Sequence, residues 1–86
     1  MTTARTWTVE IFIDEHEDQR RTHAEARLRT RDDTNLKGEG TAMRNPSDDE
    51  VPEIGDELAA ARALADLSHR LLEAAAEDIE QLARMR

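Results

Sequence analysis

The sequence predicts an α+β fold, in which a three-stranded antiparallel sheet is followed by one long C-terminal helix packed on one sheet face. Apolar and polar residues alternate through much of the chain up to Met43, and polar turn-forming segments interrupt this alternation. After Pro52 the apolar residues recur every three or four positions, which is typical of an amphipathic helix. A chain of 86 residues suffices for one core, so residues 1–86 are expected to form a single β-β-β-α domain.

The first strand is predicted near residues 6–13. One of its faces carries Trp7, Val9, Ile11 and Ile13, and the other carries Thr8, Glu10 and Phe12. Alternation with β-branched residues on the apolar side is a strong strand signal. The acidic segment 14–18 is expected to form a solvated turn, since consecutive side chains do not converge easily on one cation.

The second strand is predicted over residues 21–31. Thr22, Ala24, Ala26 and Leu28 point one way, while Arg21, His23, Glu25, Arg27, Arg29 and Arg31 point the other. Good helix formers are frequent here, so a helix is the alternative. A helix would scatter the arginines around its circumference, whereas a strand gathers them on one side, and the strand is therefore preferred.

The third strand is predicted near residues 36–43, after a turn at 32–35. Leu36, Gly38, Gly40 and Ala42 share one face of this strand. Glycines weaken a strand but allow another backbone to approach closely. We therefore expect the helix to lie against this face.

The helix is predicted near residues 54–83. Its apolar stripe, which we expect to pack on the sheet, holds Leu64, Leu67, Leu71, Ala75, Ile79 and Leu82. At about 1.5 Å per residue the helix is roughly 40 Å long, whereas strands of eight residues reach about 26 Å. Either the helix breaks, near Ser68 or residues 73–76, or a second subunit covers the overhang. A homodimer is the favoured interpretation.

Composition restricts the classes of function. The net charge is −8, and residues 47–86 contribute −7 of it, from four basic and eleven acidic side chains. This acidity disfavours non-specific nucleic-acid binding, although it leaves room for a local basic face. The sequence holds no cysteine for a disulfide or a thiolate metal site, and no apolar run long enough for a membrane span. A cytoplasmic location without membrane association is expected.

No motif predicts catalysis. Asp66, His69 and Glu73 share one helix face, where surface ion pairing explains them better than a metal or an acid–base role. Ser68 and His69 are adjacent in the helix and point about 100° apart, so they form no dyad. We expect a non-enzymatic protein with no catalytic residues, no metal, no cofactor and no small-molecule substrate.

A row of basic side chains is the main candidate for function. On the sheet face opposite the helix the sequence places Arg21, His23, Arg27, Arg29 and Arg31, with Lys37 and the aromatic Phe12 beside them. Arginine and an exposed aromatic ring suit contact with RNA. The alternative is a solvated or dimer-forming face, on which Glu10, Glu25 and Glu39 act as cross-strand partners.

The chain also resembles a known family. The resemblance is carried by Trp7-Thr8-Val9, Ile13-Asp14-Glu15-His16, Ala24-Glu25-Ala26-Arg27-Leu28, Asn45-Pro46 and the block from Ile54-Gly55-Asp56-Glu57-Leu58 to Leu67. The family comprises small actinobacterial proteins with a domain of unknown function and a fold like that of double-stranded-RNA-binding domains. It includes mycobacterial members of the dormancy response to low oxygen. The resemblance implies a β-β-β-α core, a homodimer and a likeness in shape to ribosome hibernation factors.

Two functional hypotheses follow. The first is a stress or dormancy protein that docks on the ribosome or another RNA–protein surface through the basic sheet face. The alternative is a protein–protein adaptor that acts through the acidic helix or a sheet edge, without nucleic acid.

Overall fold

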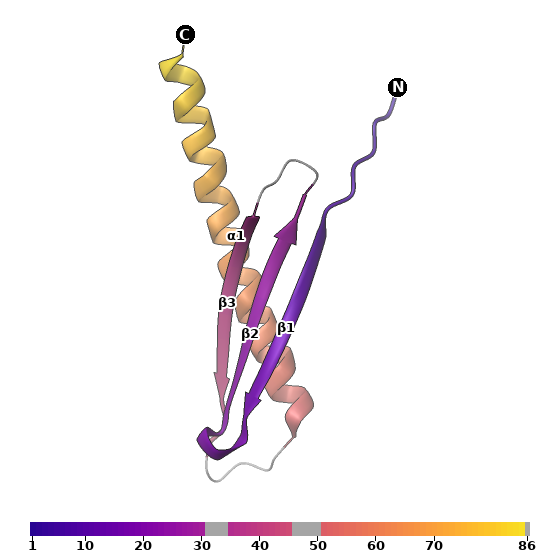
Figure 1. Ribbon diagram of the computed structural model, residues 1–86, viewed down its shortest axis with the longest axis vertical. Coiled ribbons are helices and arrows are strands. Elements are labelled where there is room, and N and C mark those ends of the chain that lie inside the picture. Colours follow the sequence, from indigo (N-terminus) through magenta and orange to yellow (C-terminus); the bar gives the residue numbers. More distant parts are fainter. Residues whose placement is uncertain (31–34, 46–50, 86) are drawn as a thin grey trace.

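The computed structural model describes residues 1–30, 35–45 and 51–85. Its elements in chain order are β1 (Thr8–His16), the 3₁₀ turn η1 (Glu17–Gln19), β2 (Arg21–Arg29), β3 (Asn35–Met43) and α1 (Pro52–Arg84). The strands form one antiparallel sheet in the order β1-β2-β3, and α1 crosses one of its faces (Figure 1). The predicted fold class is therefore confirmed.

The strand β1 runs three residues beyond its predicted end. Asp14, Glu15 and His16 pair with residues 21–23 of β2, so this part of the acidic segment is a strand end, whereas Glu17 and Asp18 lie in the turn η1 as predicted. The chain reverses only in η1 and at Arg20, whose φ of 51° lies in the left-handed region. Composition alone suggested a turn for residues 14–16, but their pairing with β2 keeps them in strand conformation.

The other strand ends differ less. The strand β1 begins at Thr8 rather than near residue 6, and β3 begins at Asn35, one residue before its predicted start. The strand β2 ends at Arg29, and Arg31, which the sequence analysis placed in this strand, lies outside the described residues.

Small side chains set the core between α1 and the sheet. The buried apolar residues are Ala24, Ala26, Leu28, Ala42, Ala59, Ala63 and Leu67, with Leu36 and Leu71 packed against them. Gly38 and Gly40 complete this surface, since a Cβ atom at either position would overlap the helix backbone near Ala63. The prediction that β3 uses glycine to admit the helix is confirmed.

Helix side chains close the outer edge of β3. The amide of Glu39 donates a hydrogen bond of 2.9 Å to Asp66 Oδ2, and Arg62 donates one of 2.7 Å to the carbonyl of Thr41. The bond from the Glu39 amide, supported by Arg70, holds the pKa of Asp66 below its usual value. These bonds satisfy backbone groups that an edge strand otherwise leaves to solvent.

The helix α1 is continuous from Pro52 to Arg84, so the alternative of a break near Ser68 or residues 73–76 does not occur. Its 33 residues span about 50 Å, against about 30 Å for nine-residue strands. The end of α1 therefore extends past the sheet, as expected (Figure 1).

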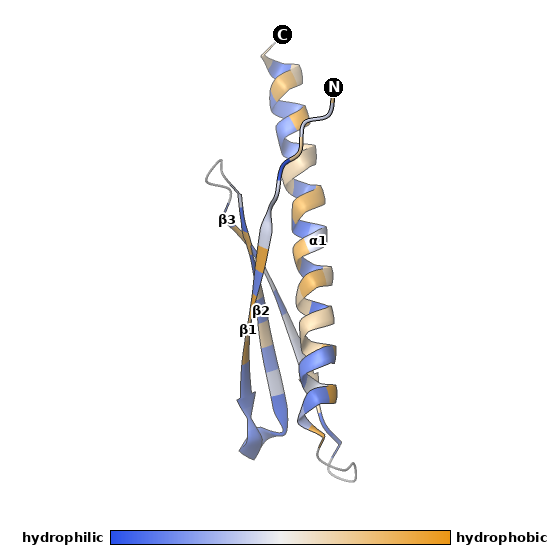
Figure 2. Ribbon diagram, turned by 90° about the vertical axis from the view of Figure 1, so that its right-hand side faces the viewer, coloured by the Kyte–Doolittle hydropathy of each residue, from blue (hydrophilic) through white to orange (hydrophobic). Residues whose placement is uncertain are grey.

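The predicted stripe packs on the sheet only in part. Leu67 is buried and Leu71 half-buried, whereas Leu64 is exposed. Ile79 and Leu82 lie on the overhanging end and are exposed, as expected for a straight helix without a partner. The sheet also receives Ala59 and Ala63, which with Leu67 are spaced by four residues. Figure 2 shows apolar residues along the whole of α1, beyond the part that lies against the sheet. No helix within the described residues is long and apolar enough to cross a membrane.

Candidate interaction surfaces

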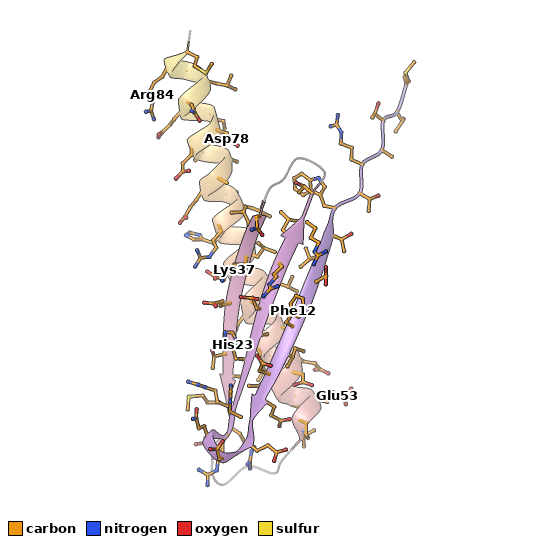
Figure 3. All side chains as sticks on the ribbon, in the orientation of Figure 1. Phe12, His23, Lys37, Glu53, Asp78 and Arg84 are labelled. Carbon is orange, nitrogen blue, oxygen red and sulfur yellow. The ribbon has the colours of Figure 1, made fainter. Side chains whose placement is uncertain are left out.

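The predicted contact residues lie together on the sheet face opposite α1, which we call the open face. Phe12 on β1, His23 on β2 and Lys37 on β3 are labelled there in Figure 3. The strand register brings Glu10, Arg27 and Lys37 into one row across the sheet. Arg21 and Arg29 follow on the same face of β2 by alternation.

Acidic side chains are interleaved with this basic row. Arg29 Nε lies 2.6 Å from Glu10 Oε1, and His23 Nε2 lies 3.9 Å from Glu39 Oε1. The described open face carries as many full positive as full negative charges: Arg21, Arg27, Arg29 and Lys37 against Glu10, Asp14, Glu25 and Glu39. The predicted role of the glutamates as cross-strand partners is confirmed.

Glu25 is the centre of this network. It accepts a hydrogen bond of 2.6 Å from Arg27 Nε and lies 3.4 Å from Lys37 Nζ. The bond from Arg27 lowers the pKa of Glu25, with Lys37 adding to the effect against partial desolvation. The Arg27 guanidinium also lies 4.5 Å from the centre of the Phe12 ring, a cation–π contact. The face is thus an ordered surface of paired charges.

A second surface lies on the helix side of β1. Val9, Ile11 and Ile13 share this side with the buried row of β2, because they pair with Leu28, Ala26 and Ala24. The helix lies mainly over β3 and β2 and touches β1 little, so these three residues stay 39%, 39% and 42% exposed. We call them the β1 lane.

A third surface is the side of α1 that faces away from the sheet. Ala61 and Ala65 lie two residues from buried Ala63, which places them about 200° around the helix from it. With them lie Ile54, Leu58, Leu72 and Ile79. All six side chains are exposed, Leu72 to 69% and Ile79 to 67%. We call this the outer stripe.

The sequence analysis gave Val9, Ile11 and Ile13 one apolar face without showing that the helix leaves it uncovered, and it did not identify the outer stripe. One signal could have found the uncovered lane. The helix-facing residues of β2 and β3 are mostly alanine and glycine, whereas those of β1 are valine and isoleucine. A helix packs most closely on strands with small side chains, so α1 lies over β2 and β3 and leaves β1, with its larger side chains, uncovered.

One cavity of about 360 Å³ lies where β1, β2 and β3 meet the start of α1. Its lining mixes apolar Met43, Ile54 and Leu58 with charged groups of both signs, including Glu15 and Arg21. This mixture defines no ligand class. Across the described ranges no three His, Cys, Asp or Glu side chains converge as a metal site. His69 pairs with Glu73 at 3.0 Å, in agreement with the surface ion pairing predicted for them.

Comparison with known proteins agrees with this architecture. The crystal structure of Rv2632c superposes with a TM-score of 0.81 at 40% identity, covering 93% of this chain and 92% of that one. Uncharacterized protein Rv2632c of Mycobacterium tuberculosis is 42% identical over 76 residues, 88% of this chain and 78% of the relative. Uncharacterized protein Mb1767 of Mycobacterium bovis is 57% identical over 74 residues, 86% of this chain and 76% of the relative.

The expected membership of an actinobacterial family of unknown function is confirmed by these relatives. The likeness to double-stranded-RNA-binding domains and the link to dormancy stay predictions. The family model described as Rv2632c-like matches residues 5–86, nearly the full chain. The chain therefore belongs to the Rv2632c-like family.

Proposed function

We propose that this chain is a non-enzymatic protein-interaction module that works through its uncovered apolar surfaces, the β1 lane and the outer stripe. The observation that supports this proposal is the position of α1 over β2 and β3, which leaves Val9, Ile11 and Ile13 exposed. The outer stripe adds six exposed apolar side chains on the side of α1 that faces away from the sheet. Large exposed apolar patches often mark interaction sites. Burial of such surface gains about 25 cal/mol per Å², which makes protein contact its natural use.

The open face supports this choice by its charge balance. Phosphate binding requires basic side chains that are free to replace counterions. Here the guanidinium of Arg29 is engaged by Glu10, and Arg27 and Lys37 share Glu25. A nucleic acid would have to displace these carboxylates, so the hypothesis of a protein adaptor is preferred to that of RNA binding.

Photo-crosslinking in a mycobacterial cell tests the proposal. A photoreactive amino acid replaces either Ile11, on the helix side of β1, or Phe12, on the open face. These neighbours have nearly equal exposure, 39% and 41%. We expect nuclease-resistant crosslinks to protein from position 11 and few from position 12. Crosslinks from position 12 alone, or crosslinks to RNA, would overturn the proposal.

A second candidate function is docking on the ribosome or another RNA–protein surface, with a role in stress or dormancy. The observation in its favour is the exposed pair of Arg27 over Phe12, since arginine and aromatic planes stack on unpaired bases. This function predicts salt-sensitive co-sedimentation with ribosomes that the double variant Arg27→Glu, Arg29→Glu abolishes. The adaptor function predicts that this double variant does not alter the co-sedimentation.

A further inference from the structure

We propose that the cavity at the start of α1 binds a small amphipathic carboxylate, a molecule with one charged head and a short apolar chain. The composition of the cavity lining defines no ligand class, but the positions of its groups do. This inference goes beyond the proposed function and shares with it only Ile54 and Leu58 of the outer stripe. It concerns binding and includes no reaction.

A buried hydroxyl group without a protein partner lies in this cavity. Thr22 of β2 lines the cavity and is only 7% exposed. A Cβ atom at Gly55 would lie 2.9 Å from Thr22 Oγ1 and 3.7 Å from Thr22 Cβ, so the hydroxyl is turned toward the first turns of α1. Within the described residues this hydroxyl takes part in no hydrogen bond. Buried hydroxyls are nearly always hydrogen-bonded, so this one calls for a partner that the protein does not supply.

Two arginines lie side by side at the end of the sheet next to this hydroxyl. The amide of Arg44 donates a hydrogen bond of 2.9 Å to the carbonyl oxygen of Arg20, so the two residues are cross-strand neighbours. Arg44 follows buried Ala42 by two positions, which puts it on the helix side of the sheet together with Thr22. Both arginines line the cavity. Positive charge is therefore concentrated where a ligand's head can also reach the hydroxyl of Thr22.

The arginines of this end differ from the cations of the open face. There, Glu10 and Glu25 engage three cations of β2 and β3. Arg20 forms no ion pair within the described part of the chain, although Glu15 and Glu17 also line the cavity. The described lining holds three arginines against these two glutamates, a positive balance in a chain that carries −8. The cavity is thus a local site for an anion in an acidic protein.

The start of α1 adds to the attraction for an anion. The N-terminal end of a helix carries partial positive charge and amide groups without helical partners. Val51, at the N-cap, makes no side-chain capping bond. It lines the cavity together with Ile54 and Gly55, whereas the acidic Glu53 and Asp56 of the same turn lie outside the lining.

Apolar side chains and the volume of the cavity define the rest of the ligand. Ile54 and Leu58 of α1 line the cavity and are 54% and 46% exposed, so an apolar chain would cover them. The volume of about 360 Å³ lies in the range of small-molecule sites. At about 30 Å³ for a water-sized group, it holds about twelve non-hydrogen atoms. Decanoate is a carboxylate of this size.

An uncharged apolar molecule is the competing occupant. It would make the same contact with Ile54 and Leu58, but it would leave Arg20 without a counter-charge. Hydrogen bonds in which one partner is ionised are about twice as strong as neutral ones. A carboxylate that bonds Thr22 and Arg20 is therefore favoured over an uncharged molecule of the same length.

Titration of the purified protein with decanoate, below its micelle-forming concentration, tests the site. We expect saturable binding by calorimetry, with changes in amide NMR shifts centred on Thr22, Ala42 and Gly55. Thr22→Val removes the hydroxyl at nearly constant volume, and Arg20→Gln removes the charge. Each should weaken binding about tenfold, since hydrogen bonds to charged groups are worth this much. Arg29→Gln, at the far end of β2, is the matched control and should leave binding unchanged.

Two further probes separate the head of the ligand from its chain. Decanol carries the chain without the charge, and acetate carries the charge without the chain. We expect each to bind at least about tenfold more weakly than decanoate, because each lacks one of the two contacts. Circular dichroism checks that every variant is folded.

Three results would overturn the inference. The first is the absence of saturable decanoate binding. The second is decanol binding as tightly as decanoate, which would show an apolar site without recognition of an anion. The third is binding that survives Thr22→Val and Arg20→Gln but is lost in Ile11→Glu, which would place decanoate on the β1 lane. The proposed function is tested separately, by crosslinking from position 11.

Discussion

The two edges of the sheet differ in almost every physical respect. The edge strand β3 presents Gly38 and Gly40 to the helix, lies beneath α1, and has outer backbone groups bonded by Asp66 and Arg62. The edge strand β1 presents valine and isoleucine, lies outside α1, and keeps its lane exposed. The comparison teaches that side-chain size directs the helix to one edge and leaves the other available for association.

The largest effect is expected from filling the glycine surface. The side chain added by Gly40→Val would overlap the helix backbone at Ala63, and α1 could no longer pack closely on β3. We expect a loss of about 3 kcal/mol in the free energy of unfolding, at the upper end for overpacked cores. Urea unfolding measures it. Thr41→Val, on the open face of the same strand, is the control, and a similar loss in both would contradict this account of β3.

A smaller effect is expected from truncation of the buried helix face. Leu67→Ala removes a side chain that is buried between α1 and the sheet, which costs about 2 kcal/mol, at the lower end for such truncations with the cavity included. Leu82→Ala shortens an exposed leucine near the helix end and should cost well under 1 kcal/mol. The two unfolding curves are compared at equal, low protein concentration. Equal losses would mean that the helix packs through a different face.

The bonds that close the β3 edge should give a pH-dependent effect. The pKa of Asp66 is lowered in the folded state, so its stabilising contribution is complete above the ordinary carboxyl value of 3.8. It is lost as the pH falls through the lowered folded value. We expect Asp66→Asn to be less stable than the natural protein at pH 7, with the gap narrowing below pH 3.8. A gap that widens on acidification would show the opposite sign of linkage.

The smallest effect is expected on the open face. Arg29→Ala removes an exposed ion pair with Glu10, and such pairs contribute about 0–1 kcal/mol. Thermal unfolding at low and raised salt measures it, because screening weakens surface pairs. A loss above about 2 kcal/mol would mean that the charge network, rather than the small-residue core, holds the sheet.

The elements and their faces could be predicted from the sequence, because the alternation of side chains is a local property. The row from Thr22 to Leu28 and the glycines of β3 face the helix as predicted. Residues 14–16 could not be assigned from composition, since their strand conformation depends on pairing with β2. A local pattern cannot predict strand pairing that depends on residues farther along the chain.

Periodicity could not predict how much of the sheet the helix covers. Alternation correctly gave Val9, Ile11 and Ile13 one face, but it does not report whether a helix lies over that face. Helix α1 has two apolar sides, and the spacing of its leucines placed Leu67 and Leu71 correctly on the sheet-facing one but included the exposed Leu64. Matching the alanines Ala59 and Ala63 to the glycines of β3 would have completed the sheet-facing side. The charge pairs of the open face were correctly anticipated, because cross-strand neighbours follow from register.

The central claim is that the β1 lane is a surface of association rather than a bare side of a monomer. The most direct test is the midpoint of thermal unfolding of the unaltered protein over a hundredfold range of concentration. Because a folded dimer that dissociates on unfolding is stabilised by mass action, we expect the midpoint to rise with concentration. We expect it to stay constant for Ile11→Glu. A midpoint independent of concentration in the unaltered protein would contradict the claim.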